Sequence, residues 1–152
     1  LPKVAVIIGS KSDQETMQIT IDLLSELGIE AELKVASAHR DPEAVAEYVK
    51  KSVENGVEIF IAAAGGAAAL PGVVASHTTL PVIGVPLTSS EMKGIDSLYS
   101  IVQMPPGMPV ATVALGGWGA RNSAVLAAQI LGLKYDKIAE ANKAYRQRLR
   151  ER

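Results

Sequence analysis

The chain has 152 residues, of which 48% are hydrophobic and 20% are charged, as is ordinary for a globular protein of one domain. Fifteen basic residues against 16 acidic ones give a formal charge of −1, with no basic stripe for nucleic acid and no polybasic cluster for a membrane. The absence of cysteine excludes disulfides, a thiolate nucleophile and a zinc–thiolate site, and it fits a cytoplasmic location.

The chain begins by alternating strand and helix patterns. Residues 3–9 are a run rich in Val and Ile, typical of a strand buried on both faces. In the next segment Met17 and Leu24 lie at helical spacing, and Gly28 is a residue type that often ends helices. Residues 30–37 then alternate as a second strand.

Asp41 and Pro42 mark the start of the second helix, because aspartate caps helices and proline loses nothing at the first helical position. The residues expected to face inward from this helix are Val45, Tyr48, Val49 and Val53. The remaining elements are expected at 57–64 (strand), 65–77 (a loop running into a short helix), 81–86 (strand), 97–104 (helix), 109–115 (strand), 120–132 (helix) and 136–152 (helix).

Five apolar strands separated by helices predict a parallel sheet with right-handed crossovers. We expect a single α/β domain over 1–152, a flavodoxin-like three-layer sandwich with strand order 2-1-3-4-5 and a C-terminal helical arm. Ligands in such sheets bind at the carboxyl ends of the strands. The Gly- and Ser-rich loops there span 9–13, 37–41, 64–72, 87–94 and 115–120.

The loop GSKSD after the first strand joins it to a helix start. Phosphate is favoured here by Ser10, Ser12 and the free N–H groups of the helix start. A helix start that is only capped, with no ligand, would show the same residues. Asp13 repels phosphate and suits a sugar hydroxyl better. The loop lacks the Walker and dinucleotide-binding patterns, so neither ATP nor NAD is indicated.

The loop SAHRDP follows the second strand, a neighbour of the first. Ser37 and Arg40 are suited to phosphate, and His39 can move a proton near neutral pH. The alternative is a polar surface turn. His77 near a helix end is explained by the helix dipole. No cluster has the spacing of metal ligands, so we expect no metal.

The segment 63–72, AAGGAAALPG, has almost no side chains. Gly65 and Gly66 allow the backbone to lie against a flat ligand, although tight helix–strand packing requires the same composition. Trp118, in GGWGARN, is either a loop lid, an interface plug or a packing residue.

In this order and spacing, GSKSD, SAHRDP, AGGAAALPG, LPVIGVP, DSLYSIVQMPPGMPVATVA and NSAVLAAQIL closely resemble the PurE family over residues 3–135. The arginine in SAHR is similar to class I, the N5-carboxyaminoimidazole ribonucleotide mutases. The resemblance implies a cytoplasmic isomerase of de novo purine biosynthesis that needs no cofactor. It moves a carboxylate from N5 to C4 of the imidazole through trapped CO2.

The resemblance also implies a homo-octamer in which the helix 136–152 packs on a neighbouring subunit. It assigns the ribose phosphate to Ser10, Asp13, Ser37 and Arg40, the imidazole and CO2 to the backbone at Ala64, Gly65 and Gly66, and the proton shuttle to His39. Ser12, Ala69 and Leu70 complete the expected substrate-binding residues.

The sequence departs from the family pattern in two places. Ala69 stands where the family usually has histidine, and Gly117–Trp118 replaces an ordinary small or charged pair. Two alternatives therefore stay open beside the mutase. One is a catalytically impaired oligomer that binds nucleotide or serves a structural role. The other is a carboxylase that adds free CO2 to aminoimidazole ribonucleotide.

Overall fold

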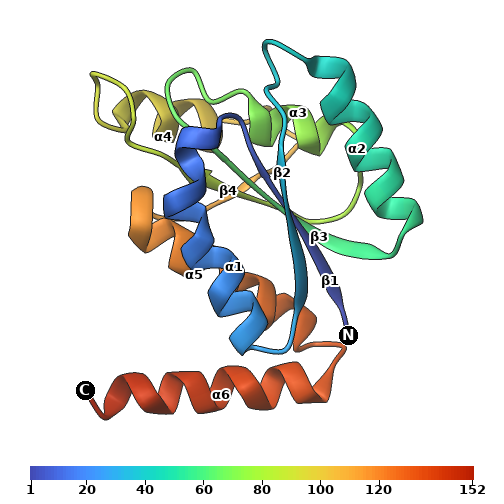
Figure 1. Ribbon diagram of the computed structural model, residues 1–152, viewed down its shortest axis with the longest axis vertical. Coiled ribbons are helices and arrows are strands. Elements are labelled where there is room, and N and C mark those ends of the chain that lie inside the picture. The colour runs from blue at the N-terminus through green and yellow to red at the C-terminus, as the bar shows by residue number, and fades with distance from the viewer.

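A computed structural model describes residues 1–152 and places a five-stranded sheet between two layers of helices (Figure 1). All strand pairs are parallel, and the order is β2-β1-β3-β4-β5, which confirms the expected fold and topology. The elements are β1 (Lys3–Ile8), a 3-10 turn η1 (Lys11–Asp13), α1 (Gln14–Glu26), β2 (Glu30–Val35), α2 (Pro42–Glu54), β3 (Val57–Ala64), α3 (Leu70–Ser76), β4 (Val82–Pro86), α4 (Ile95–Val102), β5 (Ala111–Thr112), α5 (Gly116–Leu131) and α6 (Asp136–Arg150).

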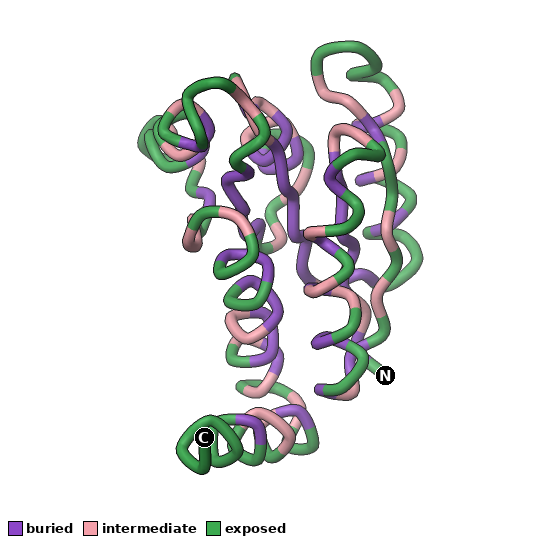
Figure 2. The backbone as a smooth tube through the Cα atoms, turned by 60° about the vertical axis from the view of Figure 1, so that its left-hand side comes forward, coloured by how far each residue is buried: buried purple, intermediate pink, exposed green.

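The sheet separates two hydrophobic clusters, and successive residues of β1 contribute to them in alternation. Val4 and Val6 pack with α1, α5 and α6, whereas Ala5 and Ile7 pack with α2, α3 and α4. This follows from strand geometry, in which neighbouring side chains point to opposite faces. The strands β1, β3 and β4 are buried except at Lys3 and Glu58, and Figure 2 shows this buried layer between the helices.

Helices α1 and α5 pack closely because α5 presents small residues. Its buried face includes Ala120, Ala124 and Ala127, all of which are fully buried. Thr20 of α1 donates a hydrogen bond of 2.7 Å to the carbonyl of Ala120, and Ser123 donates to the same oxygen at 2.8 Å. The close contact thereby satisfies the polar groups that it buries.

Local sequence signals predicted the start of α2 and the end of α1 correctly. Asp41 accepts from the N–H of Ala44 at 3.1 Å, which confirms the expected cap of α2. Gly28 has φ +83° directly after α1, as a glycine that ends a helix should. The predicted inward face of α2 was wrong at one position, since Val53 is 42% exposed and Ser52 is buried instead. Ser52, not Val53, continues the helical stripe that begins at Val45.

The region around β5 differs from the expectation for 109–115 and 120–132. The fifth strand is paired only over Ala111–Thr112, at the edge of the sheet. Helix α5 begins at Gly116 rather than at residue 120, because φ of +61° at this glycine turns the chain directly into the helix. Trp118 therefore belongs to the first turn of α5, not to a loop, and 82% of its surface is exposed.

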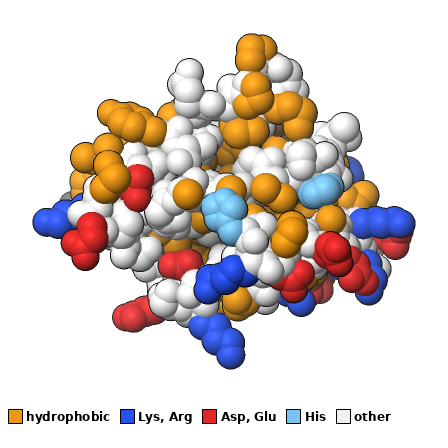
Figure 3. Space-filling model, turned by 90° about the horizontal axis from the view of Figure 1, so that it is seen from above, with side chains coloured by type: hydrophobic (Ala, Val, Ile, Leu, Met, Phe, Trp, Pro, Cys, Tyr) orange, Lys and Arg blue, Asp and Glu red, His pale blue; other side chains and the backbone are white.

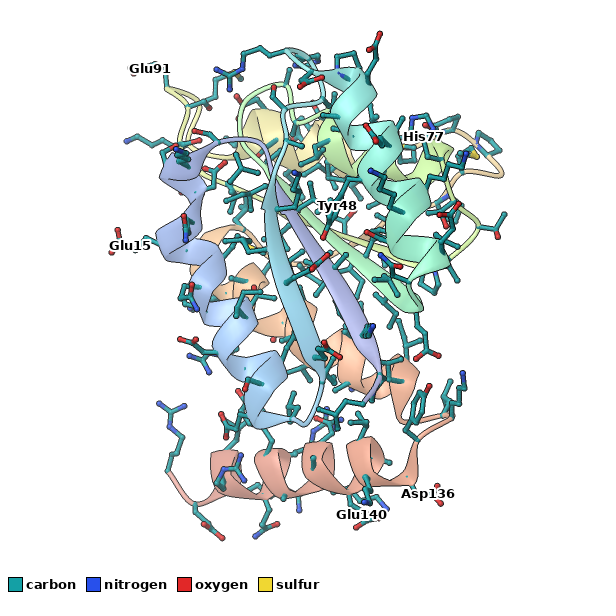
Figure 4. All side chains as sticks on the ribbon, turned by 45° about the vertical axis from the view of Figure 1, so that its right-hand side comes forward. Glu15, Tyr48, His77, Glu91, Asp136 and Glu140 are labelled. Carbon is teal, nitrogen blue, oxygen red and sulfur yellow. The ribbon has the colours of Figure 1, made fainter.

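Helix α6 runs across the amino-terminal end of the sheet, below α1 and α5 in Figure 1. Ile138 and Tyr145 anchor it in the core of its own subunit, whereas Leu149 near its end is 42% exposed. Arg148 donates to Glu26, and Figure 4 shows Asp136 and Glu140 on the outer side of the helix. No helix combines the length and hydrophobicity that a bilayer crossing requires.

Gly119 and Gly117 in the first turn of α5 offer a matched test of this packing. A Cβ on Gly119 would lie 1.7 Å from the carbonyl oxygen of Ala114, whereas one on Gly117 would meet only Ile19, at 3.9 Å. We expect Gly119→Ala to lower the free energy of unfolding by about 3 kcal/mol, because the backbone must move. Gly117→Ala should stay within about 1 kcal/mol of the parent protein. Urea denaturation measures both, and equal stabilities would contradict the predicted clash.

Candidate active site

A cavity of about 220 Å³ opens at the carboxyl edge of the sheet, the upper end of the molecule in Figure 1. Figure 3 looks onto this edge and shows a largely uncharged surface, with most acidic and basic side chains towards its rim. The loops after β1, β2, β3 and β4 border the cavity. The lining residues are Gly9, Ser10, Ser12, Asp13, Ser37, Ala38, His39, Arg40, Ala64, Gly65, Ala68, Ala69, Leu70 and Ser89.

Every site residue expected from the sequence lines this cavity except Gly66. At Gly66 φ is +62°, so the loop turns at this residue, which does not border the cavity. His77 lies just after α3 and is also outside the lining, in agreement with its interpretation as a helix-end histidine. Figure 4 shows His77 on the side of the molecule that α2 and α3 form.

The β1–α1 loop brings two hydroxyl groups together. The Oγ atoms of Ser10 and Ser12 lie 3.0 Å apart, and the N–H of Ser12 donates to Ser10 Oγ at 3.3 Å. Ser10 thus caps the turn η1 that leads into α1. Adjacent hydroxyls at the amino end of a helix are good donors for an oxygen-rich anion.

Asp13 is the buried acidic residue of the same loop, with only 8% of its surface exposed. It occupies the capping position of α1, yet its side chain makes no capping hydrogen bond. Burial raises the pKa of its carboxyl group above the ordinary 3.8, and a backbone hydrogen bond from Ser10 opposes this effect. A buried carboxylate that caps nothing is free to accept hydrogen bonds from a ligand's hydroxyl groups.

Arg40 joins the loops that follow β1 and β2. Its Nε donates to Ser37 Oγ at 3.3 Å, and its Nη2 donates to the carbonyl of Gly9 at 3.5 Å. The N–H of Arg40 also donates to Ser37 Oγ, at 3.2 Å. None of the four salt bridges in the structure includes Arg40. Its positive charge is therefore held at the cavity without a protein counter-ion, as an anion site requires.

His39 lies next to Arg40 and lines the same cavity. It is an exposed residue, and its ring makes no hydrogen bond to any protein group. Both ring nitrogens are consequently available to exchange protons with a ligand or water.

The loop after β3 forms the uncharged wall of the cavity. Two of its residues, Gly66 and Ala68, have positive φ values of 62° and 46°. The N–H groups of Gly65, Gly66 and Ala67 donate to no acceptor in the protein. Of these three residues only Gly65 lines the cavity, and its free amide can donate to an anionic oxygen there. The loop therefore offers the cavity one free amide among small side chains.

Four lining residues were not singled out from the sequence: Gly9, Ala38, Ala68 and Ser89. Gly9 and Ala38 adjoin residues that were. Ser89 belongs to the 87–94 loop, whose place at this edge was expected from the strand order, but none of its serines stood out. No group of three or more acidic or histidine side chains is arranged to hold a metal ion.

Comparison with known proteins gives one consistent result. A family model described as AIR carboxylase matches residues 3–152. The N5-carboxyaminoimidazole ribonucleotide mutase of Saccharolobus solfataricus is 54% identical over 150 residues, which cover 99% of this chain and 94% of that protein. The mutase of Thermotoga maritima is 52% identical over 150 residues, covering 99% and 86%. The crystal structure of Treponema denticola PurE has a TM-score of 0.90 at 30% identity, covering 99% and 93%.

Asp13 leads to a prediction about stability and pH. Because its pKa is raised in the folded state, the ionised carboxylate destabilises the unliganded protein at neutral pH. Asp13→Asn should therefore raise the urea midpoint at pH 7. The gain should shrink as the pH falls through the raised pKa and vanish below 3.8, the ordinary value. A gain that grows towards acid pH would contradict this assignment.

Proposed function

Because the chain belongs to the AIR carboxylase family, we propose that it catalyses the reaction for which its curated relatives are named, that of an N5-carboxyaminoimidazole ribonucleotide mutase. It is then an isomerase of purine biosynthesis, and its substrate is a small ribonucleotide. We place it in the cytoplasm with the other steps of nucleotide synthesis.

The observation that carries this proposal is the division of one cavity into two chemically different ends. At one end Arg40 bridges Ser37 and Gly9 beside the hydroxyls of Ser10 and Ser12, an arrangement that suits a phosphate. At the other end the loop after β3 offers the free amide of Gly65 and small side chains. A ribose phosphate that carries a carboxylated imidazole has the same two ends.

Asp13 supports the orientation of the sugar between these ends. The carboxylate lines the cavity beside the serines, and it would repel a phosphate placed directly on it. A ribose hydroxyl instead donates a hydrogen bond to it. We therefore place the ribose over Asp13, with the 5-phosphate towards Arg40 and the imidazole towards Gly65.

The reaction balances without an oxidant, a reductant or a second substrate. Cleavage of the N5–carboxylate bond needs one proton at N5 and releases CO2. Formation of the bond from C4 to CO2 then releases the proton of C4. One group that gives a proton and later takes one back suffices, and we assign this role to His39, whose ring is free at the cavity.

Because position 69 is alanine, His39 is the single histidine that lines this cavity, and we assign the proton transfer to it alone. His77 is not among the lining residues, so it does not take the place of a side chain at position 69. What Ala69 does supply is a small apolar surface beside Ala68 and Leu70. A wall of this kind excludes water and favours retention of CO2 next to the imidazole.

We also propose that the protein assembles as a homo-octamer, with α6 reaching a neighbouring subunit. The support is a group of exposed apolar side chains along α4, the loop before it and the first turn of α5, of the sort that marks interfaces. These residues are Met92 (58% exposed), Ile95 (53%), Tyr99 (67%), Val102 (48%) and Trp118 (82%). The outer face of α6 is exposed as well. Light scattering of the purified protein tests this assembly.

The direct test of function supplies N5-carboxyaminoimidazole ribonucleotide without ATP or bicarbonate and follows formation of the C4-carboxylated isomer. Turnover by the folded protein is the expected result. Binding measured by calorimetry without turnover would favour an impaired enzyme, and recovery in Ala69→His would show what was lost. A rate that depends on added bicarbonate and aminoimidazole ribonucleotide would favour a carboxylase instead.

For His39 we expect a loss of catalysis that leaves binding intact. His39→Asn keeps a polar side chain of similar shape but removes the titrating group, so turnover should fall to background. Nucleotide affinity should stay within about tenfold, or roughly 1.4 kcal/mol. Single-turnover kinetics and calorimetry on the same preparation separate the two quantities. Near-normal rates would refute the proton-shuttle role.

Arg40→Ala is the contrasting variant. It should weaken nucleotide binding by about 1.5–3 kcal/mol, because a charge-assisted contact to phosphate is lost. The loss should be largest for substrates that retain the 5-phosphate and small for the corresponding nucleoside. Equal losses for both ligands would remove Arg40 from the phosphate site.

A further inference from the structure

Ser89 lines the cavity but has no role in the reaction as proposed above. It comes from the β4–α4 loop, on the opposite side of Gly65 from the β1 and β2 loops in the order of the sheet. Its hydroxyl group makes no hydrogen bond to any protein group. A polar group that borders a binding cavity and has no partner is available to a ligand.

The backbone that carries this hydroxyl is held by hydrogen bonds of the residues on both sides. Before it, the N–H of Leu87 donates to the carbonyl of Ala64 at 2.9 Å, and the Leu87 carbonyl accepts from Ser97 Oγ at 2.7 Å. After it, Ser90 Oγ donates to Asp96 at 2.7 Å and accepts from the N–H of Met92 at 3.2 Å. The loop extends to Glu91 at its tip (Figure 4), yet the residues that flank Ser89 are tied to β3 and α4.

Gly65 and Ser89 fit each other closely. A Cβ on Gly65 would lie 2.3 Å from Ser89 Oγ, closer than any contact between such atoms allows. Glycine at position 65 therefore leaves free the space that this hydroxyl occupies, and a Cβ there would turn the hydroxyl to another rotamer. With glycine in place, Ser89 Oγ lies beside Gly65, a lining residue whose N–H donates to no acceptor in the protein.

We propose that Ser89 donates a hydrogen bond to the migrating carboxylate and keeps the CO2 formed from it facing C4. This inference rests on the proposed mutase reaction and adds a substrate-positioning residue to it. The carboxylate leaves N5 as CO2, which carries no charge and is held weakly by the Gly65 amide alone. A hydrogen bond from Ser89 restricts its rotation and escape until the bond to C4 forms and the C4 proton leaves.

Ser89→Ala tests this role through the fate of CO2. A mutase that loses CO2 releases aminoimidazole ribonucleotide, so the ratio of that decarboxylated nucleotide to the C4-carboxylated product reports escape directly. We expect this ratio to rise and kcat/KM to fall by about tenfold, the loss for one charge-assisted hydrogen bond. Thr88→Ala is the matched control, since it removes a neighbouring exposed hydroxyl that does not line the cavity.

The outcomes separate the two proposals. No turnover by the parent protein contradicts the mutase function itself, whatever Ser89 does. Turnover by the parent with an unchanged ratio in Ser89→Ala overturns the role of Ser89 alone. An equal rise in Thr88→Ala also overturns it, because the effect would then come from the loop. The melting temperature of both variants should match the parent, since both side chains are exposed.

Discussion

The uniform direction of the five strands is the constraint on which the site depends. Parallel strands place all their carboxyl ends at one edge, so loops far apart in the chain open into a single cavity. The order β2-β1-β3 then sets which loops adjoin. It brings Ser37 and Arg40 next to Ser10 on one side of β1 and the Gly65 loop on the other. Without this direction the same motifs would lie at opposite ends of the molecule.

Small residues have different roles in α5 and in the loop after β3. In α5 the alanines let the helix approach α1 until Thr20 reaches a backbone carbonyl. In the loop after β3 they leave backbone amides uncovered and surround them with apolar surface. The first use gives a closely packed base under the sheet edge, and the second gives the cavity an uncharged wall. The charged side chains of the lining, those of Asp13 and Arg40, come instead from the loops after β1 and β2.

Much of this was predictable from the sequence, because the signals are local or topological. Asp41–Pro42 and Gly28 mark helix ends by their own backbone preferences, and apolar runs separated by helices define the sheet. The start of α5 was missed because its first residues, Gly116 to Gly119, have low helix propensity and tertiary packing decides. Ser89 was missed for another reason. Its place over Gly65 depends on the contact between two loops, which no local pattern records.

That contact also determines what a substitution at position 65 changes in the protein. Any side chain at position 65 needs the space that Ser89 Oγ occupies, so a substitution there turns this hydroxyl to another rotamer. The serine then keeps its place in the chain but no longer presents its Oγ over the loop that follows β3. A change at position 65 thereby alters what the β4–α4 loop offers to the cavity without any change in the sequence of that loop.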